Sequence, residues 1–158
     1  MQINNKSVTI VDYNPSHHEA FRDINIEWIS EKFVVEDIDR EVLDNPDKYI
    51  LNDGGYILMA EYQSKPVATC ALINEGNDVY ELTKMGVDKN YRGLKIGSQL
   101  CRATIDKAKE VGAKKLVLHS NREGSAVAVE LYKKLGFIEV PLNNALWKRA
   151  TIKMEMEL

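Results

Sequence analysis

The fold of this chain is decided by residues 81–98, which read ELTKMGVDKNYRGLKIGS. A strand that ends at Val87 passes into a short loop, and the loop opens a helix over 93–111, where apolar side chains recur every three or four residues. Gly93 and Gly97 let the loop backbone approach a ligand closely. A helix N-terminus offers unpaired N–H groups and a partial positive charge, so this arrangement predicts a phosphate-binding turn. A plain structural connection between strand and helix is the alternative.

Charge is distributed unevenly around that turn. Residues 84–115 carry 9 Lys and Arg against 3 Asp and Glu, whereas residues 1–83 carry 6 against 16. Arg92 and Lys95 bring positive charge to the loop itself. The basic segment therefore indicates either a bound anionic ligand or a solvated helix face.

Composition bounds the class of protein. A chain of 158 residues with 44% hydrophobic and 28% charged side chains predicts one globular domain over 1–158. The net charge of −3 does not favour a nucleic-acid partner, and no apolar run is long enough for a membrane helix. The N-terminus shows no secretory signal pattern, and Cys70 and Cys101 are too few for a disulfide framework. These features predict a reduced, cytoplasmic protein without a membrane partner.

Hydrophobic patterns on both sides of residues 81–98 predict further strands and helices. Ser16 and Glu19 have the spacing of a capping box at the start of the first helix, and Gly136 stands where a left-handed residue ends the last one. The predicted fold class is mixed α/β, with about seven strands and about four helices in the order β-α-α-β-β-β-α-β-α-β-β. The expected strands cover 8–13, 56–62, 66–73, 78–87, 115–119, 137–140 and 150–158. The first expected helix begins at 15, and the other three cover 36–43, 93–111 and 125–135.

Two motifs make the interpretation more specific. Residues 92–97 read RGLKIG after a strand, and residues 131–137 read LYKKLGF. The first resembles the pyrophosphate loop of the GNAT superfamily of acyl-CoA-dependent N-acyltransferases, Arg/Gln-x-x-Gly-x-Gly/Ala, and the second resembles that family's other signature. The element order is similar to the GNAT-like fold over nearly the whole chain, most strongly from 79 to 137. Lys95 stands where the loop pattern has its first glycine, and a positive φ there would cost about 1 kcal/mol or more.

The resemblance implies that the chain binds acetyl-CoA as a co-substrate and needs no metal. The strand end at 85–87 would splay from its neighbour and hydrogen-bond the pantetheine arm through its backbone, with Gly86 relieving strain at a local bulge. Asn121, just after a strand, would contact the pantetheine or cap the next helix. The implied cofactor-binding residues are Met85, Gly86, Val87, Arg92, Gly93, Leu94, Lys95, Ile96, Gly97, Ser98, Asn121 and Tyr132.

The resemblance also implies catalytic roles for Tyr132 and Glu81. Tyr132 matches a tyrosine that protonates the leaving thiolate, a task that suits a phenol because it is neutral at pH 7. The alternative role of Tyr132 is packing in the core against Leu135 and Phe137. Glu81 lies in the register of a general-base glutamate, six residues before Val87, and the alternative is a strand carboxylate that only orders the substrate.

The histidines and cysteines have structural interpretations. His17, His18 and His119 lack metal-ligand spacing, and a lone histidine at a strand end, such as His119, is more often structural. Cys70 and Cys101 lie in apolar settings, which is typical of core residues rather than nucleophiles.

The resemblance to the GNAT superfamily therefore predicts an N-acetyltransferase that moves an acetyl group from acetyl-CoA to a primary amine of a small-molecule or amino-acid-like acceptor. It implies that the amine would attack the thioester directly in a ternary complex, with the Val87 N–H polarising the carbonyl. The alternative is a non-catalytic acyl-CoA-binding sensor or interaction module, and a homodimer stays open. The acidic N-terminal half predicts a cationic acceptor, unless its carboxylates form a solvated helix face. The carboxylates concerned are Glu31, Glu36, Asp37, Asp39 and Glu41.

Overall fold

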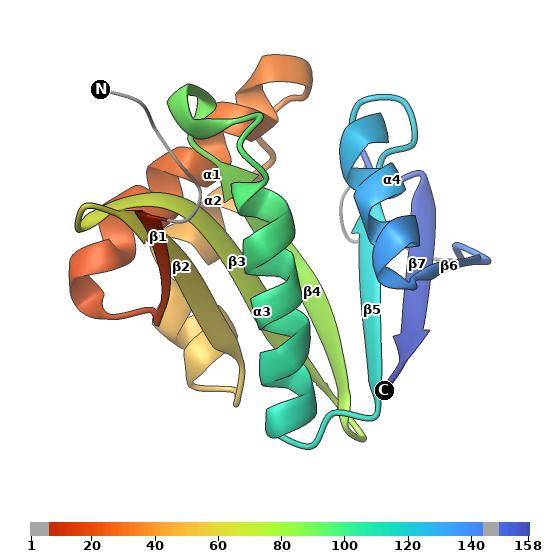
Figure 1. The fold of residues 1–158 in the computed structure, drawn as a ribbon. Coiled ribbons are helices and arrows are strands. Elements are labelled where there is room, and N and C mark those ends of the chain that lie inside the picture. Colours follow the sequence, from red (N-terminus) through yellow and green to blue (C-terminus); the bar gives the residue numbers. More distant parts are fainter. Residues whose placement is uncertain (1–6, 144–148) are drawn as a thin grey trace.

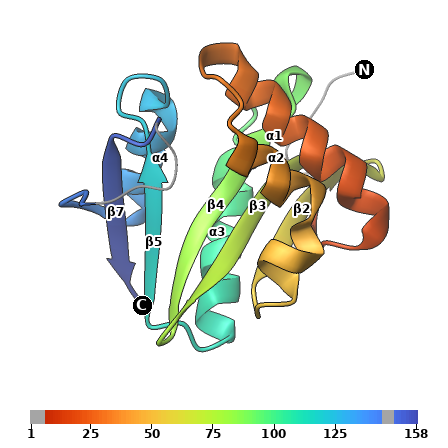
Figure 2. The same cartoon turned by 180° about the vertical axis from the view of Figure 1, so that it is seen from behind.

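The computed structural model describes residues 7–143 and 149–158 and shows a seven-stranded sheet between two layers of helices (Figure 1). The α-helices of the described residues are α1 (His18–Lys32), α2 (Asp37–Asp44), α3 (Ile96–Glu110) and α4 (Ala126–Leu135). The strands are β1 (Val8–Asp12), β2 (Tyr56–Tyr62), β3 (Lys65–Gly76), β4 (Val79–Val87), β5 (Lys115–Ser120), β6 (Ile138–Val140) and β7 (Ile152–Glu157). Their order in the sheet is β1-β2-β3-β4-β5-β7-β6. Helices α1 and α2 cover one face, and α3 and α4 cover the other (Figures 1 and 2).

The predicted order of strands and helices is confirmed, and the differences lie mainly at the ends of elements. The helix after the glycine loop begins at Ile96 rather than at Gly93, because Gly93 and Lys95 have left-handed φ angles of 79° and 63°. β3 continues to Gly76, so the turn into β4 is tighter than expected. Gly136 ends α4 with a φ of 110°, as predicted.

The predicted capping box at Ser16 and Glu19 is wrong. The side-chain oxygen of Asn14 accepts the Ser16 N–H at 2.9 Å, and His17 Nδ1 accepts the Asn14 N–H at 3.0 Å. Pro15 presets the first helical φ, so a 3-10 turn over Pro15–His17 precedes α1. Asparagine caps a helix as well as serine does, and here it comes two residues earlier.

The two faces of the sheet have separate hydrophobic cores. α3 and α4 pack on a large cluster that contains Leu82, Leu100 and Leu118. α1 and α2 pack on a smaller cluster that contains Phe21. Successive strand residues point to opposite faces, so Glu81, next to Leu82, faces the side of α1 and α2.

β4 separates from its neighbour β5 partway along the sheet. Within the described chain only the first three residues of β4, Val79–Glu81, pair with β5, in parallel register with Lys115–Val117. The two strands then diverge toward the end of the molecule where α3 begins (Figure 1). The predicted splay is confirmed, and one backbone edge of β4 after Glu81 is left without pairing to β5.

A bulge lies in β4 within the diverging part. The register of β4 against β3 shifts at Lys84 and Met85, where two residues oppose one. Lys84 has a left-handed φ of 54°, and a bulge of this kind bends and twists its strand. The strained residue of the bulge is therefore Lys84. The prediction that Gly86 would take this position is wrong. Gly86 is needed for another reason: a Cβ there would lie 2.6 Å from Trp28 Cδ1.

Candidate active site

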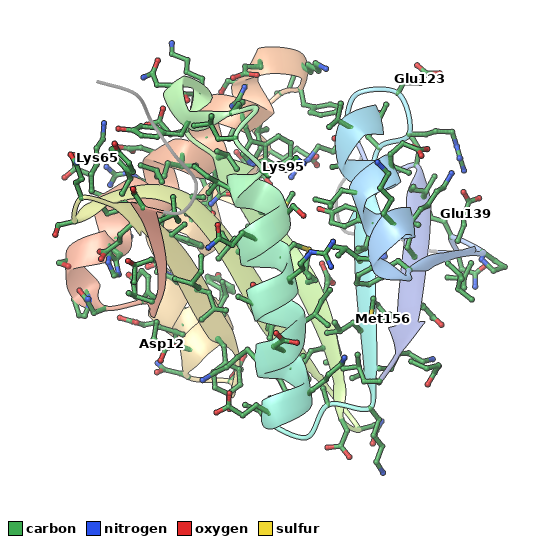
Figure 3. All side chains as sticks on the ribbon, in the orientation of Figure 1. Asp12, Lys65, Lys95, Glu123, Glu139 and Met156 are labelled. Carbon is green, nitrogen blue, oxygen red and sulfur yellow. The ribbon has the colours of Figure 1, made fainter. Side chains whose placement is uncertain are left out.

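The loop before α3 presents its backbone at the wide end of the divergence between β4 and β5. Lys95 is the N-cap of α3, and its side chain makes no capping hydrogen bond. Figure 3 shows Lys95 at the N-terminal end of that helix. The first N–H groups of a helix have no intrahelical partner, so this end of α3 suits an anion such as a phosphate. At Gly93 no heavy atom lies within 4 Å of the place a Cβ would take, which leaves space for a ligand.

Lys95 adopts the strained, left-handed conformation. Its φ of 63° costs a residue with a side chain about 1 kcal/mol or more. The side chain is exposed, and its ammonium group lies at the positive end of the α3 dipole. Both features disfavour the free protein, and the unfavourable position of the charge is the one that a bound anion would offset.

Arg92 is held by two protein partners. Its Nε donates to the Val87 carbonyl at 3.0 Å, and one terminal nitrogen donates to Glu31 Oε2 at 2.9 Å. This hydrogen bond to Arg92 lowers the pKa of the Glu31 carboxyl, because it favours the ionised form. The Arg92 side chain thus ties the loop to both α1 and the end of β4.

Hydrophobic contacts fix the loop against β4. Ile96 is buried in the larger core, and Leu94 packs on the same cluster. Gly97 is close to β4, since a Cβ there would meet Val87 Cγ2 at 3.4 Å. The structure therefore brings the predicted cofactor-binding segments of strand and loop together. The residues in this region are Met85, Gly86, Val87, Arg92, Gly93, Leu94, Lys95, Ile96, Gly97 and Ser98.

Tyr132 lies on α4 and is 7% exposed. Its ring packs edge-on against Phe137, with a centroid distance of 5.9 Å. Burial raises the pKa of Tyr132 well above its usual value, and the nearby Cys101 and Cys70 thiols add to the effect. The phenol therefore stays protonated at neutral pH, as a proton donor must, while the ring also serves the core.

Both cysteines are buried, as the interpretation of Cys70 and Cys101 as core residues expects. Burial raises the pKa of the Cys70 thiol to about 12 and moves that of Cys101 in the same direction. Neither thiol is ionised at neutral pH, so neither has the reactivity of a nucleophilic cysteine.

Glu81 lies where β4 and β5 begin to diverge, and it is 7% exposed. Its Oε2 is 3.8 Å from His119 Nδ1 on β5. Within the described residues this Nδ1 is buried without a hydrogen-bond partner. The interpretation of His119 as a merely structural residue missed this neighbour, because a parallel pairing of strands far apart in sequence creates the contact.

Asn121 organises the loop between β5 and α4. Its Oδ1 accepts the N–H groups of Gly124 at 2.6 Å and Glu123 at 3.1 Å, and its Nδ2 donates to the Arg149 carbonyl at 2.7 Å. The N-cap of α4 is Ser125, so Asn121 shapes the approach to the helix rather than capping it. Its contact with a pantetheine arm stays a prediction.

A pocket of about 70 Å³ opens on the α1 side of the diverging strands. Two aromatic side chains, Trp28 and Phe33, form part of its wall and pack edge-to-face with centroids 6.5 Å apart. Glycines accommodate both rings, because a Cβ on Gly86 would meet Trp28 and one on Gly124 would lie 2.3 Å from Phe33 Cζ. The other lining residues are Asn25, Ile29, Thr83, Lys84, Ser120, Asn121, Ser125, Arg149 and Ala150.

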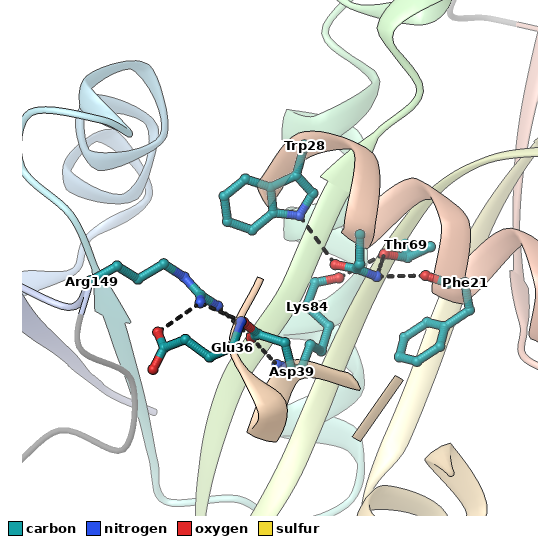
Figure 4. Close-up of polar contacts among 8 residues, drawn as sticks. Phe21, Trp28, Glu36, Asp39, Thr69, Lys84 and Arg149 are labelled. Atoms are coloured by element: carbon teal, nitrogen blue, oxygen red, sulfur yellow. Dashed lines mark hydrogen bonds and ion pairs between the residues drawn. The ribbon is translucent and has the colours of Figure 1, made fainter. Parts of the chain in front are cut away.

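A hydrogen-bond chain connects the Trp28 wall to the bulge in β4 (Figure 4). Trp28 Nε1 donates to Asn25 Oδ1 at 3.2 Å, and Asn25 Nδ2 donates to Thr69 Oγ1 at 3.0 Å. Thr69 Oγ1 in turn donates to the Lys84 carbonyl at 2.6 Å. The chain satisfies a bulge carbonyl and fixes the indole, so the pocket wall and the bend in β4 are coupled.

Buried charges form the far side of the pocket. Sequence reasoning missed Lys84 and Arg149 as site residues, whereas Asp39 was among the carboxylates expected on the acceptor side. Arg149 donates to Asp39 Oδ1 at 2.7 Å and Oδ2 at 2.8 Å, and to Glu36 at 3.2 Å (Figure 4). Lys84 Nζ lies 3.9 Å from Asp39, which is fully buried. No local signal marks Lys84, Arg149 or Asp39 as neighbours, because they come from a strand, a segment before the last strand, and a helix.

Burial and charge act in opposite directions on this cluster. Burial raises the pKa of Asp39, but the hydrogen bonds from Arg149 and the Glu36 N–H and the charges of Arg149 and Lys84 outweigh it, so the pKa is lowered overall. Burial lowers the pKa of Lys84 to about 8 despite the Asp39 charge. The Asp39 carboxyl is therefore ionised at neutral pH, whereas burial of the charged Lys84 ammonium destabilises the folded protein.

The predicted acidic wall is largely balanced by cations. Glu31 pairs with Arg92, and both Glu36 and Asp39 pair with Arg149. The pocket therefore presents mixed charge rather than an acidic surface, and the structural reason to expect a cationic acceptor is weakened.

Two kinds of feature are absent from the described ranges, 7–143 and 149–158. These ranges contain no group of three or more His, Cys, Asp and Glu side chains placed to hold a metal ion. They also contain no helix with the length and hydropathy required to cross a membrane.

Comparison with curated proteins finds partial relatives. The chain is 29% identical over 100 residues to the probable N-acetyltransferase camello of Xenopus tropicalis. The aligned segment covers 62% of this chain and 45% of that protein. It is 30% identical over 110 residues to the mycothiol acetyltransferase of Sanguibacter keddieii, which is 66% of this chain and 31% of that protein. The chain thus spans less than half the length of these relatives.

Solved structures match over nearly the full chain. A GNAT-family acetyltransferase of Staphylococcus aureus Mu50 superposes with a TM-score of 0.84 at 26% identity, covering 95% of this chain and 98% of the other. The PaiA N-acetyltransferase of Thermoplasma acidophilum, solved with coenzyme A, shares the fold with a TM-score of 0.75 at 18% identity over 96% and 99%. The family model for the acetyltransferase (GNAT) family matches residues 18–137, which is most of the chain. Because this match covers more than half of the sequence, the chain belongs to the GNAT family of acetyltransferases.

Proposed function

We propose that this protein transfers an acetyl group from acetyl-CoA to a primary amine on a small-molecule or amino-acid-like acceptor. The observation that carries the proposal is the divergence of β4 from β5 between the loop 92–98 and the pair Glu81 and Tyr132. The divergence supports the proposal because it leaves the edge of β4 after Glu81 without pairing to β5, next to the start of α3.

The donor enters from the side of α3 in this proposal. The pyrophosphate binds the N–H groups at the start of α3, with Lys95 adding positive charge. The pantetheine arm pairs with the backbone of residues 85–87 as an added strand would, because β5 has left that edge. A backbone N–H of the same segment, for which Val87 is the candidate, polarises the thioester carbonyl.

The amine enters from the side of α1, through the pocket walled by Trp28 and Phe33. An amine is an ammonium ion at neutral pH, and it must lose a proton before it attacks the thioester carbon. Glu81 accepts that proton directly or through water, and Tyr132 gives its phenolic proton to the departing thiolate. The nitrogen loses a second proton as the amide forms, and this proton restores the Tyr132 phenol. Overall an ammonium and a thioester give an amide, a thiol and one released proton.

Acetyl-CoA titration provides the first test. A ligand that binds only the folded state raises apparent stability by RT ln(1 + [L]/Kd), so millimolar acetyl-CoA should raise Tm. The absence of both a Tm shift and a calorimetric binding signal would contradict the proposed donor.

Free-thiol release from acetyl-CoA in the presence of a panel of primary amines tests the transfer itself. Tyr132→Phe should keep acetyl-CoA binding and lower kcat by about 10²–10⁴-fold, because only the donor hydroxyl is removed. Tyr80→Phe is the matched control, since Tyr80 is also a buried tyrosine in the larger core but lies on β4 where it still pairs with β5. Binding of acetyl-CoA without release of thiol for any amine would favour the non-catalytic sensor.

A further inference from the structure

Two cations line the pocket on the α1 side of the diverging strands. Lys84, on β4, is 6% exposed, and Arg149 comes from the segment before β7. The carboxylates that pair with them, Asp39 and Glu36, are not among the described residues that line the pocket. The mixed charge of the site is therefore arranged so that the positive groups border the open space.

The two cations converge on one oxygen atom (Figure 4). Lys84 Nζ lies 3.9 Å from Asp39 Oδ1, and a terminal nitrogen of Arg149 donates to the same oxygen at 2.7 Å. Asn121 holds the backbone of Arg149 as well, because its Nδ2 donates to the Arg149 carbonyl at 2.7 Å. The protein thus sets the positions of both charges before a ligand binds.

The charge of Lys84 is unfavourable in the free protein. Burial lowers its pKa to about 8 despite the charge of Asp39, and the charge of Arg149 adds to the lowering. Burying a charge costs free energy unless opposite charges compensate for it. A further anion beside these two cations would offset that cost, so the arrangement favours a ligand that carries negative charge.

Another part of the pocket wall is apolar. The rings of Trp28 and Phe33 and the side chain of Ile29 form it. Trp28 Nε1 already donates to Asn25, so the indole offers mainly carbon atoms to a ligand. A small molecule that fills the pocket therefore meets both apolar surface and positive charge.

The pocket lies next to the proposed reaction centre. Thr83 and Lys84 line it, and on β4 they lie between Glu81, the proposed base, and Val87, the candidate for polarising the thioester. A ligand there can direct an amino group at the thioester while another of its groups meets the cations. In an α-amino acid the amino group and the carboxylate sit on one carbon atom, which gives this short separation.

We propose that the acceptor is a free α-amino acid with an apolar side chain, whose carboxylate binds on the pocket side of Lys84 and Arg149. Its side chain packs on Trp28 and Phe33. Both cations keep their contacts with Asp39, so the substrate adds a second carboxylate to an existing pair of cations. The products are an N-acetylamino acid, coenzyme A and one proton. The inference rests on the proposed function, because it names the acceptor for that same transfer.

Two matched acceptors test the role of the carboxylate in an assay of free-thiol release. L-Phenylalanine and L-phenylalaninamide share the ring and the amino group, but only the first carries a carboxylate. We expect kcat/KM for phenylalanine to exceed that for the amide by about 10–100-fold, the range of a hydrogen bond to a charged group. The amide has the less basic amino group, so the reactivity of the amine would work against this preference.

Lys84→Met tests the cation itself. Methionine keeps a long unbranched side chain, and removal of the buried charge should stabilise the fold, so the variant remains testable. The ratio of kcat/KM for phenylalanine to that for phenylalaninamide should fall about tenfold or more, mainly through KM for phenylalanine. Lys109→Met is the control, since Lys109 is an exposed lysine on α3, and it should keep the wild-type ratio.

Three results would contradict the proposed acceptor. The wild type could acetylate phenylalaninamide as well as phenylalanine, or Lys84→Met could keep the wild-type ratio of the two. Transfer to other amines but to neither phenylalanine nor leucine would also overturn the inference, and would leave the proposed function standing. Release of thiol with no amine at all would instead overturn the proposed function, so the two failures are distinguishable.

Discussion

The two ends of the site are built in opposite ways. The loop end consists of residues 92–98, a contiguous segment whose groups are mostly backbone N–H and glycine. The pocket end draws its side chains from α1, β4, the end of β5, the loop before α4 and the segment before β7. One is local and exposed, and the other is assembled and partly buried.

The difference shows which interactions each end depends on. A loop that binds through its backbone needs the right φ angles and an open helix end. Single substitutions in such a loop should change the stability of the fold only modestly. A pocket held by buried charges and close aromatic packing transmits each change to its neighbours. The predictions below measure that contrast, beginning with the largest expected effect on stability.

Asp39→Asn should destabilise the fold by about 3 kcal/mol, because it leaves Arg149 and Lys84 with less compensation in a buried site. The wild-type contribution should be present above the unfolded pKa of aspartate and be lost as pH falls through the lowered folded pKa. Denaturant unfolding across acidic pH measures both effects.

Asp37→Asn is the matched control on the first turn of the same helix, where the side chain is exposed. It should change stability by no more than about 0.5 kcal/mol. Equal losses of stability in Asp39→Asn and Asp37→Asn would mean that burying the Asp39–Arg149 ion pair adds nothing to the stability of the pocket end.

Lys84→Met should stabilise the protein at pH 7, by at most about 3 kcal/mol, because the lysine pKa falls from 10.5 to about 8 on folding. Between pH 8 and 10.5 the unfolded chain binds more protons at this lysine than the folded one, so the stability of the wild type rises with pH there. The difference in unfolding free energy between variant and wild type should therefore shrink across that window.

The exposed Lys109 on α3 supplies a control for this pH window. Lys109→Met should keep a constant difference in unfolding free energy from the wild type, since the Lys109 side chain is exposed and lies outside the buried charge cluster. If the difference in unfolding free energy between Lys84→Met and the wild type is constant from pH 8 to 10.5, burial of the Lys84 ammonium does not destabilise the folded protein.

Gly86→Ala should cost about 1–3 kcal/mol, because the new Cβ would lie 2.6 Å from Trp28 Cδ1 and the indole must move. The shift should raise KM for the amine acceptor more than KM for acetyl-CoA, since Trp28 lines the acceptor pocket in our proposal. Steady-state kinetics with each substrate varied in turn separate the two constants.

Gly97→Ala makes the same change at the loop end. There the Cβ would meet Val87 Cγ2 at 3.4 Å, and alanine favours a helix over glycine by up to about 1 kcal/mol. Thermal unfolding should show Gly97→Ala as no less stable than the wild type. A larger loss for Gly97→Ala than for Gly86→Ala would reverse the proposed contrast.

Lys95→Gly should have the smallest effect on the fold. Relief of the left-handed strain, about 1 kcal/mol, is nearly offset by the greater freedom of glycine in the unfolded chain. Loss of the charge should weaken acetyl-CoA binding at low salt and matter little at high salt. A variant that binds acetyl-CoA more tightly at every salt concentration would contradict the charge role of Lys95.

Most of the fold could be predicted because its signals are local. The three- and four-residue spacing gave α3, the alternation gave β7, and Gly136 marked the end of α4. The capping error at Ser16 arose because Asn14 is an equally good cap and Pro15 starts the turn earlier. The bulge in β4 was expected at Gly86, and its position at Lys84 could not be predicted, because a lysine carries no conformational signal for a left-handed residue.

The candidate site likewise has a part with local sequence signals and a part without them. The sequence by itself determined the loop 92–98, the strand leading into it and the positions of Tyr132 and Glu81, because each belongs to a short motif with fixed spacing. Only the tertiary structure decided that His119 lies beside Glu81. It also decided that charges from α2, β4 and the segment before β7 are buried together behind two aromatic rings. Such contacts depend on sheet order and strand register, which join residues about 40 to 110 positions apart, and no local pattern of side chains encodes them.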